Sequence, residues 1–100
     1  MLDEPKAMEI VGRITREYEL KDSERNTFAV LLLSSGGKAE CSLPVREIAE
    51  MSGFSRSGVR RAVRSLEKKG LVKREARFHE EEHGARAANR YILRLGRRTG

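Results

Sequence analysis

The sequence has few of the residues that stabilise secreted or membrane-spanning proteins. Cys41 is the single cysteine, so no disulfide can form within the chain, and this fits a reducing compartment. Aromatic residues make up 5% of the chain, and no apolar run reaches the roughly 18 residues of a transmembrane helix. The first residues, MLDEPK, are acidic and lack the apolar core of a signal peptide. We therefore expect a cytoplasmic protein.

Motifs of enzymes and cofactor sites are also scarce. The chain has no Gly-rich phosphate loop, nucleophile elbow or paired catalytic carboxylates. The segment His79–His83 reads H-E-x-x-H, but zinc-protease chemistry needs both histidines on one helical face and a third ligand, and none follows here. We expect no enzyme, cofactor, metal site or small-molecule ligand, with metal binding by the two histidines as the alternative for that segment. Cys41 is expected to be a buried structural thiol, with a redox sensor as the alternative.

Positive charge is what the chain has in excess. Lysine and arginine number 21 against 15 acidic residues, so the net charge is +6 and the pI about 10. The excess is concentrated in residues 56–77, which hold nine basic residues and two glutamates, whereas the remainder sums to −1. Such a cluster favours a polyanionic partner, either nucleic acid or an anionic membrane surface.

The spacing of apolar residues predicts two helices in the first third of the chain. The first covers Pro5–Tyr18, and its apolar stripe packs either on the protein's own core or on a second copy of the chain. The second starts at Asp22 or Ser23, either of which could be the N-cap, includes the buried run 30–33, and ends at Gly36-Gly37. A short strand is expected over 39–43.

A second pair of helices is predicted around a tight turn. Pro44 begins a helix over 45–51, with Ile48, Ala49 and Met51 partly inward, and Gly53 ends it. Ser55 caps the next helix, whose stripe repeats at i, i+3, i+4 and i+7 before Gly70 stops it: Val59, Ala62, Val63 and Leu66. Two strands follow, over 71–78 and 89–95, with a polar segment between them.

This order of elements resembles the winged helix-turn-helix family. Small Ala49 permits a close helix crossing, Gly53 allows the turn, and Phe54 fills the space beneath it. The run LEKKGLV at 66–72 is similar to the family's junction between recognition helix and wing. The resemblance covers about 23–95 and implies an α+β fold, mainly α with a small β-hairpin. It also implies a three-helix core, here with an additional N-terminal helix over 1–20; residues 21–95 form the winged domain and 96–100 a basic tail.

The same resemblance implies double-stranded DNA as the partner and transcription regulation as the function. A helix fits the major groove, and arginine suits guanine edges and phosphates. The Ser55 cap and the helix N-terminus can hold a phosphate. On the helix after it we predict contacts to bases or adjacent phosphates from Arg56, Ser57, Arg60 and Arg61, and to the backbone from Arg64 and Lys68. Further backbone contacts are predicted from the wing, at Lys73, Arg77, Arg86 and Arg90, whereas the acidic tip at 80–82 would be repelled by phosphate.

Several alternatives remain at this point. A winged helix can serve as a protein-interaction module, which the acidic tip favours and the arginine row disfavours. The DNA-binding part of a phage or plasmid replication protein is a close variant of the first reading. RNA binding usually needs exposed aromatics, which are few here. Regulators of this size commonly act as homodimers on palindromic sites, and residues 1–20 are our candidate for the dimer contact. We expect the protein to be associated with the nucleoid.

Overall fold

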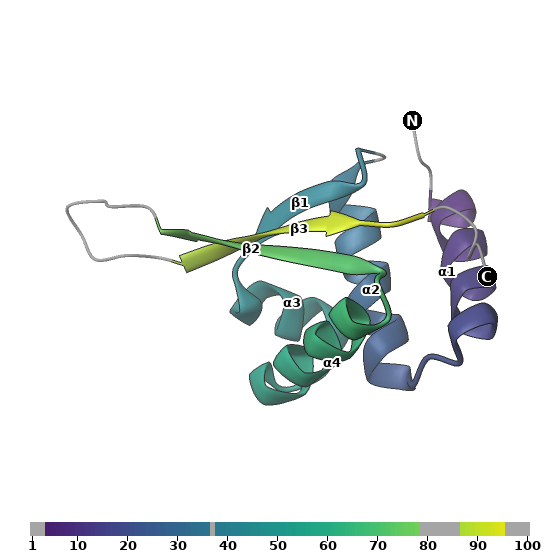
Figure 1. Ribbon diagram of the computed structural model, residues 1–100, viewed down its shortest axis with the longest axis horizontal. Helices are drawn as coiled ribbons and strands as arrows, with labels where there is room; N and C mark the ends of the chain where they lie inside the picture. The colour runs from purple at the N-terminus through teal and green to yellow at the C-terminus, as the bar shows by residue number, and fades with distance from the viewer. Residues whose placement is uncertain (1–3, 37, 79–86, 96–100) are drawn as a thin grey trace.

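The computed structural model describes residues 4–36, 38–78 and 87–95, which form four helices and one three-stranded antiparallel sheet (Figure 1). In chain order these are α1 (Glu4–Tyr18), α2 (Asp22–Ser35), β1 (Glu40–Leu43), α3 (Val45–Ser52), α4 (Arg56–Lys68), β2 (Val72–Phe78) and β3 (Ala87–Leu93). The predicted α+β class is confirmed. None of the helices in this described part is long and apolar enough to cross a bilayer.

The sheet places β3 between the other two strands. Its order is β1-β3-β2, so Tyr91 lies opposite both Cys41 and Arg74. Alternate residues of β3 face opposite sides of the sheet. Tyr91 and Leu93 are buried against the helices, whereas Arg90 is partly exposed on the other side. The small strand that the sequence predicts before α3 is β1, and it forms the third strand of the sheet by pairing with β3.

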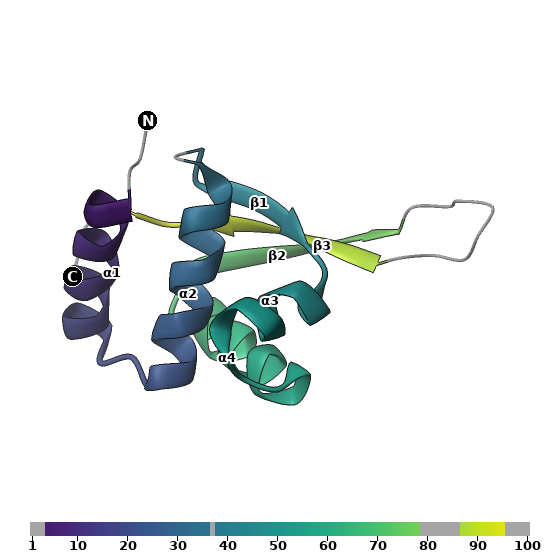
Figure 2. The ribbon, with the colours of Figure 1, turned by 180° about the vertical axis from the view of Figure 1, so that it is seen from behind.

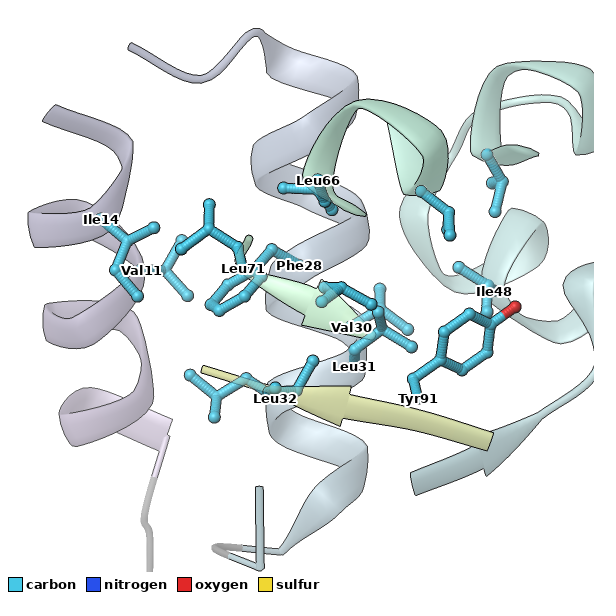
Figure 3. Close-up of a cluster of buried hydrophobic side chains, with 14 of the residues drawn as sticks. Val11, Ile14, Phe28, Val30, Leu31, Leu32, Ile48, Leu66, Leu71 and Tyr91 are labelled. Atoms are coloured by element: carbon cyan, nitrogen blue, oxygen red, sulfur yellow. The ribbon is translucent and has the colours of Figure 1, made fainter. Parts of the chain in front are cut away.

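The core is built around α2, which contacts the other three helices and the sheet. Phe28, Leu31 and Leu32 are fully buried in the middle of a continuous apolar cluster (Figure 3). All four residues of the predicted α4 stripe are buried as well. The predicted buried run at 30–33 is correct except at its last residue, since Leu33 remains 41% exposed.

The apolar stripe of α1 packs on the protein's own core. Ala7, Val11 and Ile14 are buried, and the helix lies along α2 (Figure 2). Arg13 reaches the end of the chain's last described segment, where its Nη2 donates a hydrogen bond of 2.6 Å to the Leu95 carbonyl. The first of the two alternatives for this stripe therefore holds.

Three local predictions need correction. The N-cap of α2 is Lys21, not Asp22 or Ser23, because the Glu24 carboxylate reaches back to accept a 2.7 Å bond from the Lys21 amide. Met51 is 59% exposed, since it lies in the last turn of α3 on the side away from the core. The first strand begins at Glu40, because Ala39 adopts a positive φ of 58°.

Candidate nucleic-acid interface

Helices α3 and α4 meet through a turn that is held by its own backbone. Gly53 adopts a left-handed φ of 79°, where a side chain would be strained, and its N–H donates to the Ala49 carbonyl at 3.0 Å. The Asn26 amide nitrogen of α2 donates to the Ser52 carbonyl at 3.2 Å. The turn is therefore fixed both by its own closing bond and to the central helix, and this sets the direction in which α4 leaves it.

Ser55 is the N-cap of α4, as the sequence predicts. Its Oγ accepts a hydrogen bond of 3.0 Å from the Gly58 amide, which satisfies one of the free N–H groups of the first turn. Gly58 lies close to this cap, because a Cβ at that position would be 3.3 Å from Ser55 Oγ. The first turn of α4 therefore leaves little room for a side chain at position 58.

The side of α4 opposite the core forms a basic face. We use this term for six exposed residues: Arg56, Ser57, Arg60, Arg61, Arg64 and Lys68. Within the residues that the structure describes, the five cationic side chains of this face make no hydrogen bond or ion pair. All six residues were predicted from the sequence, and the structure brings them together on one helix surface.

Of the seven other arginines whose side chains are described, four are in ion pairs, whereas Arg16, Arg46 and Arg94 are not. Arg13 contacts Glu17 at 3.4 Å, Arg25 contacts Asp22 at 3.5 Å, and Arg74 contacts Glu67 at 3.7 Å. Exposed arginines without carboxylate partners are solvated cations that can bind an anion without first breaking an ion pair. The basic face therefore differs from the paired arginines in availability, and from the three other unpaired ones because its cations lie together on one helix.

The wing residues predicted to touch DNA are placed less favourably. Arg90 lies between two carboxylates, 2.6 Å from Glu40 and 3.3 Å from Glu75, so it ties the central strand to both neighbours. The hydrogen bond to Glu40 raises the pKa of the Arg90 guanidinium above its usual value. Lys73 lies on the same sheet face, 4.0 Å from Glu75. Two of the predicted cations are thus partly neutralised by acids.

Two more predicted wing contacts cannot be placed in the same way. Arg77 belongs to β2, but its side chain lies outside the description. Arg86 and the H-E-x-x-H segment 79–83 lie outside the described residues altogether. Among the residues that are described, no three His, Cys, Asp or Glu side chains gather in a way that could hold a metal ion.

Sequence reasoning missed a polar cluster that joins the start of α2 to the second half of α4. Besides its bond to the Lys21 amide, the Glu24 carboxylate accepts hydrogen bonds from Ser65 Oγ and, at 2.7 Å, from Lys69 Nζ. Burial on its own raises the pKa of Glu24, but these hydrogen bonds outweigh it, so the pKa lies below its usual value. A glutamate at the third position of a helix is a sequence signal for the bond from Glu24 to the Lys21 amide. No sequence pattern indicates that Ser65 and Lys69 are its other partners.

Cys41 lies on the inner side of β1 and is partly buried. Burial raises the pKa of its thiol to about 11, so the thiol stays protonated near neutral pH. Because the thiolate is the reactive form, this placement supports the structural role predicted for Cys41.

Comparison with known proteins agrees with this geometry. A family model described as "Sugar-specific transcriptional regulator TrmB" matches residues 15–80, a span that contains α2, the helix-turn-helix and β2. No curated protein sequence matches the chain. A crystal structure of a transcriptional regulator of the MarR family from Silicibacter pomeroyi has the same fold, with a TM-score of 0.55 and 19% sequence identity.

The structural match covers 90% of this chain but 53% of the other, so the chain spans about half the length of that regulator. At this level of identity the match concerns the fold alone, and it confirms the winged helix-turn-helix architecture predicted from the sequence. The family match covers about two thirds of the chain and includes the basic helix. The chain belongs to the TrmB family, whose model is described as that of sugar-specific transcriptional regulators.

Proposed function

We propose that the protein recognises a specific double-stranded DNA sequence by inserting α4 into the major groove. The observation that carries this proposal is the basic face, whose five cations have no partner among the described residues. A single α-helix fits the major groove, and its N-terminal residues usually point to base edges. The N-terminal half of α4 carries three of the arginines: Arg56, Arg60 and Arg61.

The roles within the face follow from this orientation. Arg56, Ser57, Arg60 and Arg61 contact bases or the phosphates beside them, with Ser55 at the helix start, whereas Arg64 and Lys68 contact the backbone. Lys73, Arg77, Arg86 and Arg90 are secondary backbone contacts from the wing. Since phosphate contacts position the protein and base contacts specify the sequence, substitutions in the two sets should have different signatures.

Selection of bound duplexes from a random pool would identify the operator, and fluorescence anisotropy with that duplex then tests the roles. Replacing Arg60 or Arg61 by Ala should weaken binding by about 1–3 kcal/mol each and relax sequence preference at one position. Arg25→Ala is a control, because it also removes an exposed arginine, but from α2 and not from the basic face. Unchanged affinity of both α4 variants would contradict the proposal and favour use of α4 as a protein-interaction surface.

We propose in addition that two copies of the protein act together as a homodimer on DNA, with residues 1–20 in the contact. We also propose that this chain has no catalytic activity and binds no small-molecule ligand. Cytoplasmic localisation at the nucleoid follows from the DNA partner. The family's description as sugar-specific makes genes of sugar use the first candidates in a search for the operator.

A further inference from the structure

A pocket of about 410 Å³ lies beside the basic face, between α4 and the start of α2. It is lined from α2 by Lys21, Ser23 and Glu24, and from the turn and α4 by Phe54, Ser55, Gly58, Arg61, Ala62 and Ser65. Ser55 and Arg61 therefore belong both to the pocket and to the surface that we assign to DNA. The pocket is continuous with that surface and extends it sideways onto α2.

The free charge that the pocket presents is positive. Lys21 and Arg61 each carry a cationic side chain that makes no ion pair with any described residue. Glu24 is the single acid in the lining, and its carboxylate already accepts bonds from Lys69, Ser65 and the Lys21 amide. An anion entering the pocket therefore meets two unpaired cations and a carboxylate that is already neutralised by Lys69.

Hydroxyl donors complete the lining. Ser23 contributes a side-chain oxygen that makes no hydrogen bond within the described chain. Ser55 Oγ accepts from the Gly58 amide, which leaves its own proton available for donation. Gly58 leaves the Ser55 hydroxyl uncovered, since a Cβ at position 58 would lie only 3.3 Å from Ser55 Oγ. Two serine hydroxyls and two cationic side chains can therefore donate hydrogen bonds to the oxygens of a singly charged phosphodiester.

We propose that this pocket binds one phosphodiester group of the DNA strand that borders the groove occupied by α4, with Lys21 and Ser23 as contacts outside the recognition helix. The inference rests on the proposed insertion of α4 into the major groove. When a helix fills that groove, an element directly beside it meets the sugar-phosphate backbone. Lys21 and Ser23 thus position the protein without reading sequence.

The test measures the salt dependence of binding for Lys21→Ala against Lys38→Ala. Both substitutions remove one exposed lysine, but Lys38 follows the opposite end of α2, which is about 21 Å long. Loss of one phosphate contact should reduce the slope of log K against log salt by about 0.9. K21A should show this reduction equally on operator and random duplexes, and K38A should keep the wild-type slope. Circular dichroism melts of both variants verify folding.

A phosphate-specific measurement completes the test. Neutral methylphosphonate groups are placed one at a time along the operator strand. We expect one position to weaken wild-type binding several-fold but to leave K21A unaffected, because the two changes remove the same contact. A wild-type slope for K21A, or an equal effect of every methylphosphonate on both proteins, would overturn this inference. If the wild type binds no duplex at low salt, the proposed function itself fails, and that outcome is distinct.

Discussion

The arginines of this protein differ in their partners more than in their exposure. Arg90 and Arg64 are both accessible to solvent, but Arg90 is held between Glu40 and Glu75, whereas Arg64 makes no ion pair with a described residue. A phosphate competes with two carboxylates for Arg90 and with water alone for Arg64. An arginine without an ion pair should therefore contribute more to DNA binding than an arginine that is paired with carboxylates, although both carry the same charge.

Comparing Arg64→Ala with Arg90→Ala tests this reasoning. Arg64→Ala should reduce the salt slope of DNA binding by about 0.9, as expected for one lost phosphate contact, and should leave the melting temperature near the wild-type value. Arg90→Ala should reduce the slope by less than half as much and lower the melting temperature, because it removes the link among three strands. Equal slopes for the two variants would show that Arg90 releases its carboxylates to bind DNA.

Glu24 makes stability depend on pH in a defined window. Its folded-state pKa lies below the ordinary value of 4.5, so near that pH the unfolded chain binds more protons than the folded chain. The stabilisation from the Glu24 cluster is therefore present above pH 4.5 and is lost as the pH falls through the lower, folded-state pKa. Glu24→Gln should reduce the free energy of unfolding by about 1.5–3 kcal/mol at pH 7, and by less at pH 3.5.

Urea unfolding of both proteins across pH 3–7 measures this difference. Glu17→Gln is a suitable control, because Glu17 forms an i, i+4 pair with Arg13 near the surface and should contribute below about 0.5 kcal/mol. A Glu24→Gln deficit that stays constant from pH 7 to pH 3.5 would mean that the side chain acts through shape and not through charge.

At the scale of the elements, features set by neighbouring residues could be predicted from the sequence. Ser55 caps α4 and Gly53 closes the turn because short-range backbone geometry demands these residue types. The Glu24 cluster and the Glu40–Arg90–Glu75 bridge could not be predicted in the same way. Each joins positions 41 to 50 residues apart or depends on strand register, which is known only once the chain has folded.

The role of α1 shows the same limit. Its apolar spacing predicted a helix, but the same stripe suited either the protein's own core or a second copy of the chain. The structure buries Ala7, Val11 and Ile14 against the core, so the helix completes the fold. Amphipathic spacing gives the face that is buried, whereas the surface that buries it depends on the arrangement of α2 and the sheet.

At the scale of the molecule, positive charge and apolar surface are distributed differently. Five cations without an ion pair to a described residue gather along α4, with Lys21 beside them in the adjoining pocket. The large apolar residues exposed in the described part are Met8, Leu33 and Met51, on three separate helices. A stable homodimer usually buries well over 1,000 Å² with an apolar centre. The described surface therefore supports DNA binding more strongly than it supports a permanent dimer.

We accordingly predict that the chain is a monomer when free and that two copies assemble on DNA. Sedimentation velocity should give a single species near 11.3 kDa at micromolar concentration. With a palindromic operator whose half-sites lie about 34 Å apart, two chains should bind each duplex cooperatively. If residues 1–20 form the contact, Met8→Glu should remove the cooperativity but preserve binding to a single half-site, since Met8 is exposed on α1. A free dimer that persists at nanomolar concentration would require an apolar interface that the described surface lacks.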